Sequence, residues 1–127
     1  MKEGIVLFAH GSREPGWAEP FERISRELER RCPGVPVKLA YLERMKPSLG
    51  EAIASLAAAG ASRVRVVPAF LGAGGHIKHD LPKLAAAART RHPALEIVLE
   101  KTIGERPETI AALAAVISKG FSDQTRS

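Results

Sequence analysis

Two histidines stand where a short apolar run or a glycine-rich loop ends. His10 directly follows the apolar run 5–9, and His76 follows the small residues 72–75. A neutral imidazole can accept a proton or hold a divalent metal ion. The alternative for each is a hydrogen-bonded histidine with a structural role at a strand end or a helix start. If the preceding strands are neighbours, ~4.8 Å apart, both rings can face the same space.

A carboxylate follows another apolar run at the same kind of position. Glu43 comes after residues 37–42, where it can act as a base or as a third metal ligand. Its alternative is a surface carboxylate paired with Arg44 or Lys46. The residue types alone do not choose between these two interpretations.

Further polar residues follow His76 closely. His79 comes three residues later, so on a helix it can share a face with His76 and complete a metal pair, or it is simply solvated. Asp80 can orient His76 through a hydrogen bond. His92 precedes a proline at an expected helix end, where the helix dipole explains it better than a site does.

Positive charge is in excess, with 19 Lys and Arg against 14 Asp and Glu and a formal charge of +5. This balance favours anionic partners. Aromatic residues make up only 5% of the chain, so a stacking platform for single-stranded nucleic acid is not expected. A small polyanion fits equally well, and a flat one can approach the backbone where side chains are absent. The candidate contacts for such a substrate are Arg13, Arg44, Lys46, Gly74, Gly75 and Lys78.

Two common catalytic patterns do not match the sequence. Loop 72–76 lacks the Lys-Ser/Thr of a P-loop and the third glycine of the dinucleotide fingerprint. Ser12 is not in the Gly-x-Ser-x-Gly context of a nucleophile elbow. The histidines and Glu43 therefore remain the candidates for chemistry.

Four apolar runs alternate with four segments of helical periodicity, and together they must position these residues. We expect strands at 5–9, 37–42, 64–69 and 95–99, and helices at about 17–31, 48–60, 78–91 and 107–119. A β-α unit repeated four times predicts one α/β domain, with a four-stranded parallel sheet covered by helices on both faces. Residues 1–120 form this domain, and the polar tail 121–127 is expected to fray.

The expected compartment is the cytoplasm. Cys32 is the only cysteine, which excludes an internal disulfide and suits a reducing environment. No apolar run approaches the ~18–20 residues that span a bilayer. The N-terminal residues 1–9 are interpreted as a strand rather than a signal peptide.

At the level of motifs, the chain resembles the small sirohydrochlorin cobaltochelatases and ferrochelatases, which are CbiX-like class II chelatases. The resemblance extends over roughly residues 4–120. The matching segments are Phe8-Ala9-His10-Gly11-Ser12-Arg13, Tyr41-Leu42-Glu43 with Pro47-Ser48, and Pro68-Ala69-Phe70-Leu71 leading through Gly75-His76 to Asp80-Leu81-Pro82.

The resemblance implies a chelatase-like fold and a lyase-type reaction that inserts a divalent metal into a tetrapyrrole on the way to cobalamin or sirohaem. It assigns the metal-binding and catalytic roles to His10 and His76, with Glu43 lining the same cleft. Cobalt is the expected metal, with iron or nickel as alternatives, and the metal is a substrate. No organic cofactor is required. The cations named above would pair with the carboxylates of sirohydrochlorin, and two copies would pair as a homodimer.

Three other functions use the same residues differently. A non-catalytic tetrapyrrole or metal carrier would bind at the same edge without accelerating a reaction. A phosphometabolite-binding protein would use the loop 72–75. A nucleic-acid-binding protein would show steep salt dependence. We expect neither nucleic acid nor a membrane as a partner.

Overall fold

The computed structural model describes residues 2–72 and 74–126, and the side chains of residues 2–72 and 74–120. Four strands alternate with four helices, as predicted. Their bounds are β1 Glu3–Ala9, α1 Glu19–Arg31, β2 Val37–Tyr41, α2 Leu49–Ala58, β3 Arg63–Pro68, α3 Gly75–Arg91, β4 Glu96–Leu99, a short 3₁₀ helix η1 Ile103–Glu105, and α4 Pro107–Arg126.

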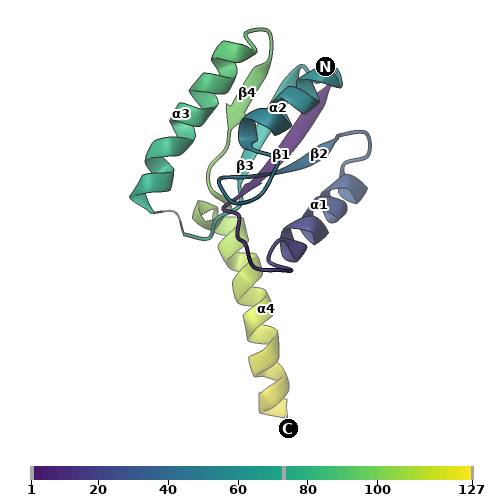
Figure 1. Ribbon diagram of the computed structural model, residues 1–127. Helices are drawn as coiled ribbons and strands as arrows, with labels where there is room; N and C mark the ends of the chain where they lie inside the picture. Colours follow the sequence, from purple (N-terminus) through teal and green to yellow (C-terminus); the bar gives the residue numbers. More distant parts are fainter. Residues whose placement is uncertain (1, 73, 127) are drawn as a thin grey trace.

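All four strands are parallel and form one sheet in the order β2-β1-β3-β4. The strands that precede His10 and His76, β1 and β3, are therefore neighbours, which confirms the condition on which the sequence prediction depended. Phe8 pairs with Pro68 and Ala9 pairs with Tyr41 across the ladder. The carboxyl ends of the strands thus meet at one edge, which lies at the lower end of the sheet in Figure 1.

One face of the sheet is fully apolar and is covered by α2 and α3. Alternate strand residues such as Val6, Phe8 and Val66 are buried there, in one cluster with Ile53 of α2 and Leu81 of α3. Helix α2 begins as predicted, because Ser48 and Glu51 form both hydrogen bonds of a capping box. This face is the main hydrophobic core.

The opposite face is divided into two halves. Over β2 and β1 it is apolar and covered by α1, where Ala9 and Tyr41 pack with Ala18 and the half-buried Phe21. The apolar spacing of Phe21, Ile24 and Leu28 in the sequence predicts one buried stripe on α1, but Ile24 is exposed and Ser25 is the buried residue of the helix.

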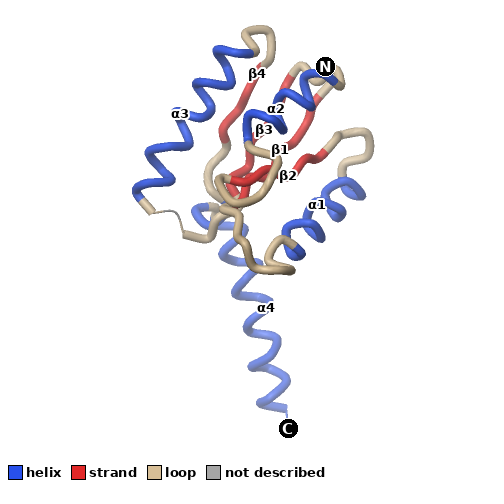
Figure 2. Tube along the Cα trace, in the orientation of Figure 1, coloured by secondary structure: helices blue, strands red, loops and turns tan. Residues whose placement is uncertain are grey.

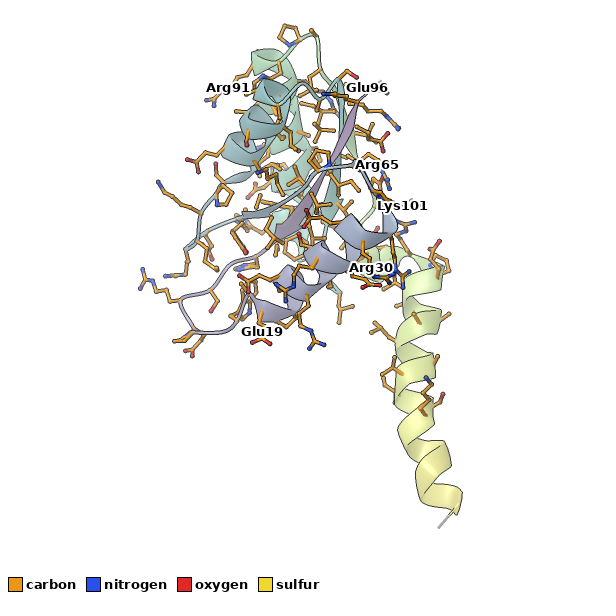
Figure 3. All side chains as sticks on the ribbon, turned by 90° about the vertical axis from the view of Figure 1, so that its right-hand side faces the viewer. Glu19, Arg30, Arg65, Arg91, Glu96 and Lys101 are labelled. Carbon is orange, nitrogen blue, oxygen red and sulfur yellow. The ribbon has the colours of Figure 1, made fainter. Side chains whose placement is uncertain are left out.

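Over β3 and β4 the same face is charged. Arg63 pairs with Glu3 at 3.0 Å and with Glu96 at 3.4 Å, and Arg65 donates a hydrogen bond to Glu100. Figure 3 shows Arg65 and Glu96 on one side of the sheet and Arg91 of α3 on the other. The ion pairs account for the alternation at the start of β3, where Arg63 and Arg65 face the side opposite to Val64 and Val66.

Glu100 makes the stability of the fold sensitive to acid. The hydrogen bond from Arg65 holds the pKa of Glu100 below its ordinary value of 4.5. A carboxylate with a lowered folded-state pKa contributes stability above its ordinary pKa and loses it as the pH falls through the lowered value. We therefore expect the free energy of unfolding to fall as the pH is lowered below the ordinary carboxyl pKa of 4.5. In urea titrations, Glu100→Gln should flatten this fall, whereas Glu29→Gln on the exposed surface of α1 should not. Parallel curves for the wild type and Glu100→Gln would contradict the assignment.

Two helix boundaries differ from the sequence prediction. Helix α3 begins at Gly75 and not near Lys78, so His76 lies in its first turn. Helix α4 continues through Gly120, where the prediction ended it, to Arg126. Backbone helicity therefore extends into the segment predicted to fray, of which Ser127 lies outside the described residues.

Helix α4 also differs in its placement, because it does not cover the sheet. It extends away from the sheet at the carboxyl ends of the strands, as Figures 1 and 2 show. Its side chains from Ile110 to Gly120 are exposed. The helices that cover the two faces are therefore α1 on one side and α2 with α3 on the other. Among the described residues, no helix combines the length and apolar character needed to cross a membrane.

Candidate functional site

His10 and Glu43 come together because β1 and β2 are neighbours. The backbone of Glu43 donates to the carbonyl of His10 at 3.1 Å, which continues the strand pairing beyond the sheet. The two side chains also lie close together, with His10 Nδ1 3.8 Å from Glu43 Oε1. Nδ1 also lies 3.2 Å from the carbonyl oxygen of Gly11. Both side chains are about half exposed, at 47% and 50%, so a ligand can reach them.

Gly11 is what allows the two loops to approach so closely. Its φ is +94°, in the region that favours glycine, and a Cβ at this position would overlap the carbonyl oxygen of Glu43. The glycine after His10 therefore has a structural cause that the sequence motif did not reveal.

His76 is held by a different partner. It lies in the first turn of α3, where its Nε2 is 3.2 Å from Asp80 Oδ2, one helical turn later. This is the contact expected from the sequence. His76 is otherwise exposed, with 85% of its side chain accessible. His79 is exposed in the same part of α3.

The backbone segment that leads to His76 contacts the 3₁₀ helix η1, an element that the sequence did not predict. The amide of Gly104 donates to the carbonyl of Phe70 at 2.9 Å, and a Cβ on Gly104 would overlap the backbone of Leu71. Glu105 forms an ion pair with Lys78 at 3.3 Å. The available signal was Gly104 itself, a glycine that follows the fourth strand at the same edge of the sheet.

The predicted substrate contacts are all exposed, and two of them have protein partners. Arg44, at a φ of +67°, places its Nε 4.0 Å from Glu43 Oε1, while Lys78 pairs with Glu105. The carboxylate of Glu43 therefore lies near both Arg44, as in the alternative interpretation, and His10. The other four predicted contacts are also exposed; they are Arg13, Lys46, Gly74 and Gly75. Their role toward a substrate stays a prediction.

The site is an open edge and not an enclosed cavity. Three cavities in the described part of the chain, among them one of about 280 Å³ between α2 and α3, are lined by neither His10 nor His76. Among the described side chains, those of residues 2–72 and 74–120, no group of three or more from His, Cys, Asp and Glu is arranged to hold a metal. What the edge offers is two separate pairs, His10 with Glu43 and His76 with Asp80.

Known proteins share both the sequence and the fold. The model of the CbiX family matches residues 4–119. The sirohydrochlorin cobaltochelatase of Methanosarcina barkeri is 33% identical over 76% of this chain and 74% of its own length. That of Methanothermobacter thermautotrophicus is 39% identical over 65% of this chain and 57% of its own. The chain therefore matches 74% of the length of the first relative and 57% of the length of the second.

Two crystal structures extend the comparison. A CbiX protein from Marinobacter aquaeolei VT8 superposes with a TM-score of 0.85 at 28% identity, covering 98% of this chain and 99% of its own. The sirohydrochlorin chelatase SirB from Bacillus subtilis subspecies spizizenii, in complex with cobalt, superposes with a TM-score of 0.79 at 26% identity. The superposition covers 94% of this chain but only 51% of the SirB chain. The resemblance inferred from the motifs is confirmed, and the chain belongs to the CbiX family.

Proposed function

We propose that this protein is a sirohydrochlorin chelatase, which inserts a divalent metal ion into the tetrapyrrole. Its family membership and the names of its relatives support this activity. The structural observation that supports it best is the position of His10 with Glu43, and of His76 with Asp80, at the carboxyl edge of one parallel sheet. In open α/β sheets, ligands bind outside this edge.

The reaction sets three chemical requirements. The metal must lose its water ligands, the macrocycle must expose its nitrogen lone pairs, and two pyrrole protons must leave. Imidazole is a suitable ligand for cobalt, iron and nickel, and it can also accept a proton. His10 and His76 would hold the metal substrate and receive the departing protons.

The partners of the two imidazoles indicate which nitrogen each presents. In His10, Nδ1 faces the carbonyl of Gly11, so an Nδ1–H donates there and leaves the Nε2 lone pair available. In His76, Nε2 faces the carboxylate of Asp80, so an Nε2–H donates there and leaves Nδ1 available. Asp80 therefore orients the His76 ring, as carboxylates commonly do beside metal-binding histidines.

Glu43 and the surrounding cations complete the proposed site. The carboxylate of Glu43 lies near His10, where it can take up a proton or serve as a third metal ligand. Sirohydrochlorin carries several acetate and propionate groups, and ion pairs with cations at this edge would orient it. The cations concerned are Arg13, Arg44, Lys46 and Lys78, with Gly74 and Gly75 leaving room for the flat ring.

Two copies of the chain would form a homodimer. The exposed histidines leave the metal in contact with water on a single copy, and a second copy would enclose it. The length of SirB is consistent with two such units around one site, because the part that matches this chain is about half of SirB. We further propose cobalt as the metal, with iron or nickel as alternatives, a place in cobalamin or sirohaem synthesis, and a cytoplasmic location.

The test is a spectroscopic assay of metal insertion. Purified protein is mixed with metal-free sirohydrochlorin and Co²⁺, Fe²⁺ or Ni²⁺, and the visible spectrum of the macrocycle is followed. We expect acceleration above the protein-free rate with at least one metal, since general-base assistance alone contributes ~10²–10⁴-fold. Tight binding without acceleration would instead identify a carrier, and neither binding nor acceleration would reject both functions.

A further inference from the structure

The short helix η1 contacts the chain both before and after His76. Before it, the amide of Gly104 donates to the carbonyl of Phe70 at 2.9 Å. After it, Glu105 Oε1 lies 3.3 Å from Nζ of Lys78, two residues beyond the histidine. Two adjacent residues of one element therefore reach both sides of the turn of α3 that carries His76.

The contact before His76 is so close that it requires a glycine in η1. A Cβ on Gly104 would overlap the backbone of Leu71. The φ of Gly104 lies outside the left-handed region, so the requirement here is space, whereas at Gly11 both space and conformation require glycine. Because two backbones are in direct contact, any displacement of η1 also displaces the segment that leads to His76.

The contact after His76 is an ion pair at the surface. The side chains of Lys78 and Glu105 are 60% and 45% exposed, and a pair of this kind contributes little to the overall stability. Its effect is local, because the amide of Lys78 also donates to the carbonyl of Gly74 at 3.1 Å and so belongs to the first turn of α3. The ion pair therefore fixes this turn against η1.

The helix η1 is itself anchored to the sheet. Arg106, at its C-terminal end, lies 3.5 Å from Glu100 Oε1 through its Nη1. The other carboxylate oxygen of Glu100 accepts a hydrogen bond from Arg65 of β3. Since Glu100 is only 18% exposed, this link is shielded better than an ordinary surface pair. The turn that carries His76 is thus tied through η1 to β3, the neighbour of β1.

We propose that η1 is a positioning element for metal insertion, in which Gly104 and Glu105 set where the backbone of His76 lies relative to His10. This rests on the proposed function, because it assigns both residues to the same site. The side chain of His76 is 85% exposed, so its place depends on the backbone that carries it more than on packing around the ring. Lys78 has three N–H donors, so it can hold Glu105 and still donate to a carboxylate of the substrate.

The variant Gly104→Ala tests the close contact. The added methyl group would push η1 and Leu71 apart and displace His76. We expect kcat for insertion of Co²⁺ into sirohydrochlorin to fall ~10²-fold, the scale of a misplacement of about 1 Å. KM for sirohydrochlorin should change little, since the substrate contacts remain. Gly50→Ala adds the same group in α2, where nothing lies within 4 Å, and should keep the wild-type kcat.

The variant Glu105→Gln tests the ion pair without a change of shape, so it does not endanger the fold. We expect kcat to fall by up to ~5-fold, the scale of an exposed pair, and Glu105→Asp, which keeps the carboxylate, should recover most of this loss. The matched control is Glu108→Gln, whose carboxylate lies 3.6 Å from Arg106, and it should not change kcat. A raised KM with unchanged kcat in Glu105→Gln would instead show that Glu105 only holds Lys78 for the substrate, and would overturn the proposal.

Hydrogen exchange, measured by NMR without metal or tetrapyrrole, gives a readout that does not depend on activity. The amide of Lys78 should exchange ~10-fold faster or more in Gly104→Ala, and less markedly so in Glu105→Gln. The amide of Leu42, which donates to the carbonyl of Ala9 at 2.9 Å, should keep its protection and thereby show that the sheet is intact. Unchanged exchange at Lys78, or wild-type kcat in both variants, would overturn the proposal. Faster exchange at Lys78 in a protein whose wild type inserts no metal would reject the chelatase function, while the coupling of η1 to the first turn of α3 would stand.

Discussion

Replacing His10 or His76 by alanine should lower the rate of metal insertion into sirohydrochlorin by ~10²-fold or more, the scale of losing a positioned general base. Each variant also removes one metal ligand. The two histidines stand on different elements and have different partners, Glu43 and Asp80, so loss of one leaves the other in place. The measurement is the initial rate of spectral change of the macrocycle at fixed metal and protein concentrations.

The chain offers a matched control for these variants. His92 terminates α3 at the opposite end of the sheet, so His92→Ala removes an imidazole from the protein without touching the proposed site. Its rate should equal that of the wild type. His79→Ala tests whether this residue adds a ligand beside His76. Near-normal rates in both His10→Ala and His76→Ala would remove the catalytic assignment while leaving family and fold unaffected.

Replacing Gly11 by alanine should both destabilise the protein and abolish insertion. The new Cβ would overlap the carbonyl of Glu43, and backbone atoms of a paired loop cannot move aside cheaply. We expect a loss of about 3 kcal/mol in the free energy of unfolding, combining backbone strain with overpacking. Because the loops of β1 and β2 would separate, His10 and Glu43 would also move apart. Urea denaturation and the insertion assay measure the two effects.

The variant Gly16→Ala separates the effect of backbone strain from the effect of steric overlap. Gly16 also has a positive φ, +78°, but a Cβ there would meet nothing within 4 Å. Gly16→Ala should therefore cost only the strain of the left-handed conformation, about 1–2 kcal/mol, and should retain insertion activity. If the two alanine variants were equally stable and equally active, the close approach at Gly11 would have no functional consequence.

The sequence predicted the arrangement of the sheet well because strand burial leaves a strong pattern. The unbroken apolar run that forms β1 lies in the interior of the sheet, while the Arg-Val alternation of β3 matches its charged face. The start of the second helix near Ser48 was also predicted, and it is fixed locally by a capping box between two residues three positions apart. Local patterns of this kind need no knowledge of the tertiary structure.

The parts that the sequence did not predict depend on contacts between distant residues. The periodicity of residues 107–119 indicates an apolar face but does not say which surface covers it, so α4 was expected on the sheet. The support of the His76 segment by Gly104 joins residues more than thirty positions apart along the chain. Whether His10 and His76 bind one metal stays a prediction, because each ring contacts its own carboxylate and not the other ring.

The length of α4 has a consequence for how such a unit can be duplicated. Its 20 residues span ~30 Å, whereas the seven residues of β1 span ~23 Å. Because α4 leaves the carboxyl edge of the sheet and points away from it (Figure 1), its last turn lies well beyond the edge that carries His10 and His76. In a tandem duplication of this unit, α4 would stand between the two copies and separate their sheets by up to its own length, ~30 Å.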